Sequence, residues 1–118
     1  LLFYHAATGE CSVLGADTLP LGVVADVEII VGDPIRMKVG DIFAVISDGV
    51  FEAANPADGL FGSARTVDVI CAHCGESPAQ ILAALRKAVD EFAGEAPAAD
   101  DRTAIIIKRT GRPRSPRK

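Results

Sequence analysis

The stretch 42–46, Ile-Phe-Ala-Val-Ile, constrains the fold more than any other part of this sequence. It is apolar at every position, and it lies between a Gly-Asp turn at 40–41 and the polar residues Ser47-Asp48-Gly49. A strand that is apolar on consecutive positions is typical of the interior of a sheet, where both faces are covered. The sequence therefore predicts a central strand over 42–47, buried on both faces.

Other apolar and β-branched runs predict further strands. Residues 1–5 and 11–14 are two short runs joined by Thr8-Gly9-Glu10, which favours a hairpin. Residues 27–31 are rich in Val and Ile, and 103–109 contain Ala-Ile-Ile-Ile. These two runs predict one strand before the central strand and a closing strand at the end of the domain.

Two helices are predicted between the central and closing strands. Ser63 is a candidate cap for a helix that runs to about Cys74, where Gly75 ends it. Ser77 and Gln80 form a capping-box pattern with proline between them, and Gly94 ends that second helix. Its apolar residues recur at helical spacing: Ile81, Leu82, Leu85, Ala88, Val89 and Phe92. The order of elements predicts an α+β fold, with helices on one side of a largely antiparallel sheet.

The charge distribution separates a body from a tail. Residues 1–109 hold 8 basic and all 16 acidic residues, a net charge of 8 − 16 = −8, whereas the other four basic residues lie in 112–118. We expect a domain over 1–109 and a disordered basic tail over 110–118. The acidic body argues against nucleic acid as the main partner, and no apolar run is long enough to span a membrane.

Three aspartates stand at the ends of predicted strands. Asp48 directly follows the central strand, and Asp100-Asp101 precede the closing strand. If the two strands are neighbours, these carboxylates converge and repel one another unless a cation lies between them. Oxygen-only ligands favour Mg²⁺ or Mn²⁺, and Gly49 has no Cβ to keep a ligand away. The alternative is that these are surface-loop aspartates, because Asp-Gly is common in turns.

The three cysteines favour a structural interpretation. Cys71-Ala72-His73-Cys74 has the spacing of a metal or redox motif, but there is no second Cys/His pair to complete a zinc site. Cys11 is alone on its strand, and His5 is expected to be exposed at the end of another. We expect free thiols in a reducing compartment, the cytoplasm, acting as small apolar residues.

Two separated motifs resemble those of a known family. Residues 40–53, Gly-Asp-Ile-Phe-Ala-Val-Ile-Ser-Asp-Gly-Val-Phe-Glu-Ala, are similar to a stretch in which Gly-Asp opens a strand that ends in Thr/Ser-Asp-Gly-Val-x-Glu-Ala. Residues 100–103, Asp-Asp-Arg-Thr, are similar to a closing Asp-Asp-x-Thr segment. The family is that of the PPM-type (PP2C-like) serine/threonine phosphatases of the SpoIIE/RsbU kind, and the resemblance spans residues 1–109.

The resemblance implies both a fold and a chemistry. The family fold is a sandwich of two antiparallel sheets flanked by helices, with two Mn²⁺ or Mg²⁺ ions at one end. By resemblance, Asp48 and Asp100 are metal ligands, Asp101 is the reserve candidate, and Gly49 lets the backbone approach the metal. The nucleophile is then a metal-bound water rather than a side chain. The implied substrate is phosphoserine or phosphothreonine on a signalling protein, such as an anti-sigma-factor antagonist.

The family's other metal-binding aspartates belong to motifs that do not occur in this sequence. We therefore expect the C-terminal part of the phosphatase domain, with weak Mn²⁺ binding and little activity by itself. The alternative is a non-catalytic signalling module of the same fold, which binds a partner without hydrolysis. A small cupin-type barrel ranks last, because its metal sites depend on histidines, and neither His5 nor His73 lies near the strands concerned.

Overall fold

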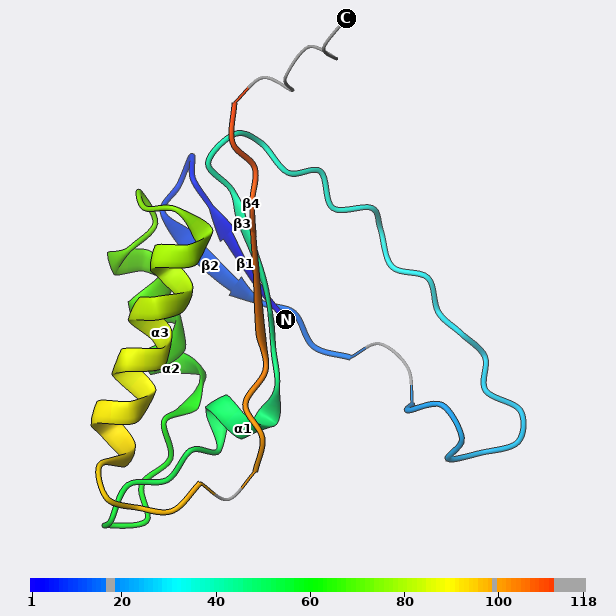
Figure 1. The fold of residues 1–118 in the computed structure, drawn as a ribbon. Helices are drawn as coiled ribbons and strands as arrows, with labels where there is room; N and C mark the ends of the chain where they lie inside the picture. Colours follow the sequence, from blue (N-terminus) through cyan, green and yellow to red (C-terminus); the bar gives the residue numbers. More distant parts are fainter. Residues whose placement is uncertain (17–18, 99, 112–118) are drawn as a thin grey trace, which may run out of the picture.

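The computed structural model describes residues 1–16, 19–98 and 100–111, which form one antiparallel sheet with helices on one of its faces (Figure 1). This arrangement confirms the predicted α+β class. Of the predicted basic tail, residues 112–118 lie outside the described part. The elements are β1 (Leu2–His5), β2 (Glu10–Val13), β3 (Ile42–Ile46), α1 (Asp48–Phe51), α2 (Gly62–Ala72), α3 (Pro78–Ala93) and β4 (Ala104–Lys108).

The strand order is β2-β1-β3-β4, with every neighbouring pair antiparallel. Phe43 of β3 pairs with Phe3 on one side and with Ile107 on the other, so β3 has a partner along both edges. The prediction of a central strand at this position is therefore confirmed. The predicted hairpin is also present as β1 and β2.

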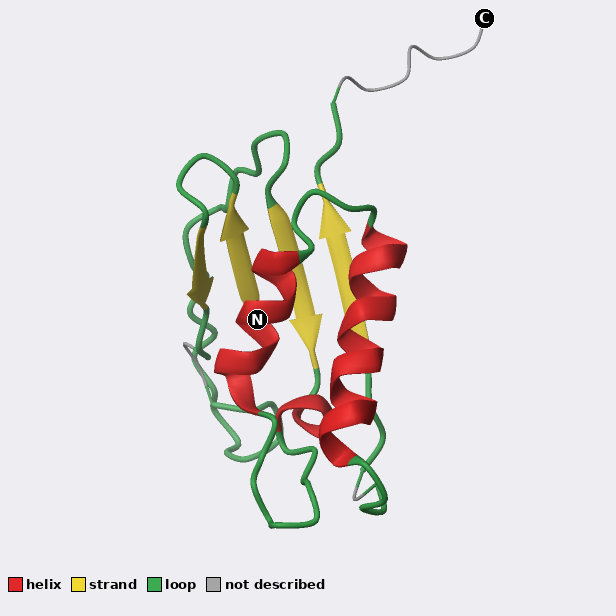
Figure 2. Cartoon of the chain, turned by 90° about the vertical axis from the view of Figure 1, so that its left-hand side faces the viewer, coloured by secondary structure: helices red, strands yellow, loops and turns green. Residues whose placement is uncertain are grey.

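The helices α2 and α3 lie together over one face of the sheet (Figure 2). α3 packs on β4, and α2 packs on β1 and β2. Alternate side chains of the strands meet the buried side of both helices, and burying each large aliphatic side chain contributes about 1.5–3 kcal/mol. The buried members of this core are Leu2, Tyr4, Ile42, Ala44, Ile46, Val50, Ala53, Phe61, Ile70, Ile81, Leu85 and Val89.

The opposite face of the sheet is apolar and largely uncovered. By register, Phe43 and Val45 point to this face together with Ile105 and Ile107, which are 52% and 47% exposed. The prediction that β3 is buried on both faces is therefore wrong for this side, where Phe43 and Val45 are only half-buried. The reason is that the described residues supply a single sheet and a single helical layer.

The predicted strand at 27–31 is wrong. Residues 27–31 adopt no regular secondary structure, and Val31 is 87% exposed. The segment that joins β2 to β3 leaves on the side of the sheet opposite to the helices and stands away from it (Figure 1). β-Branched residues favour a strand only where a neighbouring strand offers hydrogen bonds and packing, and this segment lies beyond the reach of the sheet.

The helix limits follow local signals with one exception. The capping box of α3 is present: Gln80 N donates to Ser77 Oγ at 3.3 Å, and Ser77 N donates to Gln80 Oε1 at 2.9 Å. The predicted Ser63 cap of α2 is wrong, because the chain turns into the helix at Gly62, where φ is 75°, and Phe61 becomes the cap residue. No helix in the described part of the chain combines the length and apolar character required to cross a membrane.

Candidate functional site

The end of β3 and the start of β4 are joined by two hydrogen bonds. Ser47 N donates to the carbonyl oxygen of Thr103 at 2.9 Å, and Thr103 N donates to Ser47 Oγ at 2.9 Å. These bonds extend the strand pairing by one step beyond Ile46 and Ala104. Residues 47–49 follow β3 and residues 100–103 precede β4, so both segments lie at the same end of these two strands. They are termed here the rim. The structure brings Asp48 to the same rim as Asp100 and Asp101.

Gly49 faces the backbone of Asp101 across the rim. A Cβ built at position 49 would lie 1.9 Å from the carbonyl oxygen of Asp101, a separation that no side chain tolerates. Glycine is therefore required for the two segments to meet. The structure continues β3 into the short helix α1, in whose first turn Asp48 lies.

The three aspartates of the rim are exposed. Asp100 Oδ1 accepts a hydrogen bond from Asp101 N at 2.8 Å, and a carboxylate has further lone pairs for a cation. Their oxygen atoms fit Mn²⁺ or Mg²⁺ in kind. In the described residues 1–16, 19–98 and 100–111, however, these three carboxylates do not come together as a group that could hold an ion.

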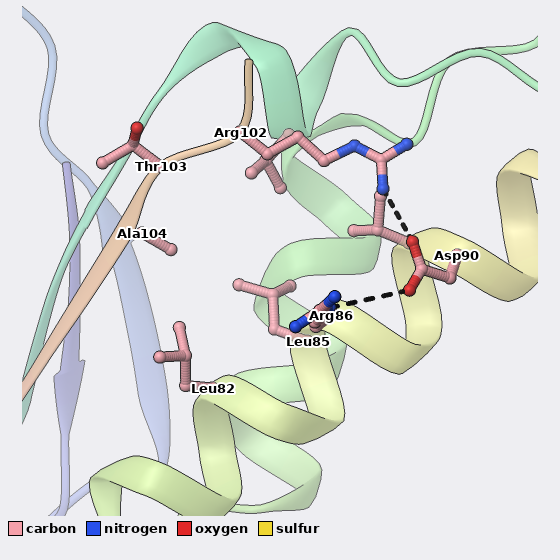
Figure 3. A pocket seen from close by; sticks show the side chains of 9 residues that line it. Leu82, Leu85, Arg86, Asp90, Arg102, Thr103 and Ala104 are labelled. Carbon is pink, nitrogen blue, oxygen red and sulfur yellow. Dashed lines mark hydrogen bonds and ion pairs between the residues drawn. The ribbon is translucent and has the colours of Figure 1, made fainter. Parts of the chain in front are cut away.

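Two cavities adjoin the rim, and Asp90 and Arg102 line both. The acidic cavity, of about 490 Å³, is lined by Asp90, Ala93, Gly94, Ala96, Ala98, Asp100, Asp101 and Arg102. The arginine cavity, of about 420 Å³, is lined by Val50, Leu82, Leu85, Arg86, Val89, Asp90, Arg102, Thr103 and Ala104. Figure 3 shows the arginine cavity, with Arg102 reaching across to Asp90.

Asp90 is shared by two arginines. Arg102 Nη1 donates to Asp90 Oδ1 at 2.8 Å, and Arg86 Nε lies 3.9 Å from Asp90 Oδ2 (Figure 3). The first contact ties the segment before β4 to α3, whereas the second is long and exposed. Sequence analysis did not identify this cluster, because Arg102 meets the Arg86–Asp90 pair of α3 only when α3 packs on β4.

Asp41 holds the other end of β3. Its buried carboxylate accepts hydrogen bonds from Lys38 N at 2.7 Å and from Ala6 N at 2.9 Å. These two backbone donors, Lys38 first, hold the pKa of Asp41 below its ordinary value. The Gly-Asp turn predicted from the sequence therefore contains a structural carboxylate, a role that the turn pattern did not reveal.

The cysteines gather on the core side of the sheet. All three are free thiols packed against the core, and α2 lies on β2, so that Cys11 comes near Cys71. This proximity was not expected from a residue alone on its strand. Burial raises the pKa of both Cys11 and Cys71, with a smaller effect from neighbouring thiols. Thiols with a raised pKa are poor nucleophiles, in agreement with a structural role.

The two histidines make local contacts only in the described structure. His73 Nδ1 lies 2.7 Å from Glu76 Oε2 at the end of α2, and exposed His5 lies 3.4 Å from Ser12 Oγ through its Nε2 atom.

Lys108 Nζ donates to the carbonyl oxygens of Cys74 and Glu76, both at 2.7 Å. Lys108 thus fixes the chain after α2 to β4.

One comparison with known proteins gives a match. The family model described as Stage II sporulation protein E (SpoIIE) matches residues 1–110. No curated protein and no solved structure matches the chain. The matched range includes every strand and helix of the structure, the three aspartates of the rim and both cavities.

Proposed function

The chain belongs to the SpoIIE family, a family of phosphatase-related domains, and we propose that it is the C-terminal portion of a metal-dependent protein serine/threonine phosphatase domain. The observation that carries the proposal is the joined rim. Hydrogen bonds between Ser47 and Thr103, and the close approach of Gly49 to Asp101, support it, because they join the backbone segments that carry Asp48 and the Asp100-Asp101 pair.

Asp48 and Asp100 are the proposed ligands of Mn²⁺ or Mg²⁺, with Asp101 as the reserve candidate. Bound at the rim, such an ion would supply Lewis-acid activation of a phosphoryl group and of water. The protein's part is to hold the carboxylates in place, and the strand pairing beneath them does so. No side chain of the chain is proposed as the nucleophile.

The number of ligands limits what this chain does by itself. A complete site for two ions needs more oxygen ligands than the rim offers. We therefore propose that further ligands come from the rest of the domain, and that the 118-residue chain binds Mn²⁺ weakly and turns over slowly.

The proposed substrate is a phosphorylated signalling protein, such as an anti-sigma-factor antagonist, in the cytoplasm. Support for a protein substrate comes from family membership and from the charge of the body, which is −8 over residues 1–109 and repels nucleic acid.

A test of the proposal measures Mn²⁺ binding by calorimetry and hydrolysis of p-nitrophenyl phosphate. Asp48→Asn, Asp100→Asn and Asp101→Asn are compared with Asp58→Asn, which removes an exposed carboxylate from the loop between α1 and α2. We expect weak Mn²⁺ binding that Asp48→Asn abolishes and Asp58→Asn leaves intact. Comparison of Asp100→Asn with Asp101→Asn identifies which of these two aspartates is the second ligand. Equal Mn²⁺ binding by all four variants would show that the aspartates of the rim are not the metal ligands.

Robust turnover by the isolated chain, lost in Asp48→Asn, would instead show that the rim needs no further ligands. A second candidate function is a non-catalytic partner-binding module, favoured by the lack of a grouped set of three metal ligands in the described residues. That function is indicated if a phosphorylated partner binds the chain and keeps its phosphate in the presence of Mn²⁺.

A further inference from the structure

The arginine cavity has an apolar floor that faces solvent. Leu82, Leu85, Val89 and Val50 line it from the helices, and Ala104 lines it from β4. Leu82 is 40% exposed although it lies on the apolar side of α3. A volume of about 420 Å³ is in the range of ligand-binding cavities and is ample for a leucine-sized side chain.

The wall of the arginine cavity carries a net positive charge. Two guanidinium groups, Arg86 and Arg102, share one carboxylate, Asp90, which gives +1 on a body that is otherwise strongly acidic. Arg102 is the fixed member, with a 2.8 Å contact and a side chain that is 28% exposed. Arg86 is the adjustable member: its side chain is 86% exposed and its contact with Asp90 is 3.9 Å. An exposed pair of this kind contributes little, so Arg86 can exchange Asp90 for another acceptor at small cost.

The arginine cavity also adjoins the proposed metal site. Arg102 follows Asp101 directly in the chain, and both Arg102 and Asp90 line the acidic cavity that contains Asp100 and Asp101. A peptide with its phosphorylated residue at the rim would therefore pass the Arg102–Asp90 pair and reach the apolar floor within a few residues. The acidic cavity disfavours carboxylates, whereas the arginine cavity attracts them.

From this arrangement we propose that the arginine cavity docks a segment of the protein substrate that carries a branched apolar side chain beside one or two carboxylates. The apolar side chain fills the floor between Leu82 and Ala104, and the carboxylates pair with Arg86 and Arg102. The assignment of this partner as the substrate rests on the proposed function, but the docking chemistry does not require the metal.

The test uses the whole ¹⁵N-labelled chain in buffer with a chelator, titrated with unphosphorylated short peptides. The probes contain Glu-Leu-Glu, Lys-Leu-Lys or Glu-Ser-Glu between glycines. We expect Glu-Leu-Glu to shift the amide signals of Leu82, Arg86 and Ala104, with weaker binding as ionic strength rises. The other two probes should bind at least about fivefold more weakly, because each lacks one of the two complementary features.

Arg86→Ala and Lys87→Ala form a matched pair of variants. Both remove an exposed cation from the same helix, but Lys87 pairs with Glu91 and does not line the arginine cavity. We expect Arg86→Ala to weaken Glu-Leu-Glu binding about fivefold and Lys87→Ala to leave it unchanged. Leu82→Ser, at a partly exposed position, should also weaken it.

Three results would overturn the proposal: equal affinity for Glu-Leu-Glu and Lys-Leu-Lys, equal effects of Arg86→Ala and Lys87→Ala, or shifts confined to the uncovered sheet face around Phe43 and Ile105. Because the titration contains neither metal nor phosphate, its outcome is independent of the phosphatase assay. Docking without Mn²⁺ binding at Asp48 would leave the arginine cavity as a protein-docking site and remove the phosphatase proposal. Mn²⁺ binding at Asp48 without peptide docking would remove the docking proposal and leave the phosphatase proposal in place.

Discussion

The carbonyl oxygen of Asp101 occupies the position into which a side chain at Gly49 would project, 1.9 Å from the Cβ site. Both residues are held by flanking strands, since Ser47 and Thr103 are hydrogen-bonded in both directions. The contact joins the two arms of the rim by backbone alone, so it is present before any ligand binds.

We predict that Gly49→Ala destabilises the fold by about 3 kcal/mol or more, because the two segments must separate to admit the methyl group. Urea unfolding followed by circular dichroism measures the loss. Gly75→Ala is the control, since a Cβ at that position meets no atom within 4 Å. Similar stability of the two variants would show that the rim segments do not touch.

Replacing Asp41 by Asn should lower the free energy of unfolding by about 2 kcal/mol at neutral pH. One of the two backbone N–H donors, from Lys38 or Ala6, would then face the amide NH₂ instead of a carboxylate oxygen. Asp26→Asn, an exposed change of the same type, serves as the control and should have little effect.

The carboxylate of Asp41 should also make the free energy of unfolding depend on pH. The pKa of Asp41 is lower in the folded chain than in the unfolded chain, where it is about 3.9. The stability that its carboxylate contributes is therefore complete above about pH 3.9 and is lost as the pH falls through the folded pKa. The difference in stability between the native chain and Asp41→Asn should therefore narrow as the medium becomes strongly acidic. A difference that widens towards low pH would contradict this assignment.

Lys108→Met keeps the apolar stem of the side chain but removes the ammonium group that binds the carbonyl oxygens of Cys74 and Glu76. We expect a loss of about 1–2 kcal/mol in thermal or urea unfolding, because one partly buried and one exposed carbonyl oxygen lose a charged donor. Lys87→Met changes a lysine that is 76% exposed on α3 and should cost much less. Hydrogen exchange should become faster at the end of α2 in Lys108→Met alone.

Cys11 and Cys71 are partly buried, and we predict that they are alkylated slowly. Since burial raises the pKa of Cys11 and Cys71, fewer thiolates are present at pH 8 than for an ordinary cysteine, whose pKa is about 8.5. Iodoacetamide should modify these two sites more slowly in the folded chain than in urea, and the folded rate should keep rising above pH 9. Peptide mapping by mass spectrometry resolves each site, and equal rates in folded and unfolded chains would contradict the structure.

Local signals in the sequence were sufficient for α3 and β3. The capping box at Ser77 and the helical spacing of Ile81, Leu85 and Val89 act over a few residues, so the sequence alone determines that helix. The strand predicted at 27–31 failed for the opposite reason. Its Val and Ile content indicates a strand only if another strand lies alongside, and the sequence does not reveal whether one does.

The candidate site likewise contains some residues that the sequence could indicate and others that it could not. Asp48 and the Asp100-Asp101 pair were singled out because they lie next to predicted strands and match motifs of the family, features visible without any tertiary structure, and their role as metal ligands stays a prediction. The cluster of Arg86, Asp90 and Arg102 was missed, because it depends on how α3 lies against β4. The nearness of Cys11 to Cys71 likewise depends on the packing of α2 on β2.

The pairing of Ile46 with Ala104 has a kinetic consequence, because residues 47–103 lie between them. The β1–β2 hairpin and the helix pair involve neighbours in the chain and can form early, whereas the β3–β4 ladder must await closure of this long loop. We therefore predict that β4, the strand that completes the rim, joins the sheet last. In a refolding experiment, tertiary signals from β4 should appear after the helical signal has developed.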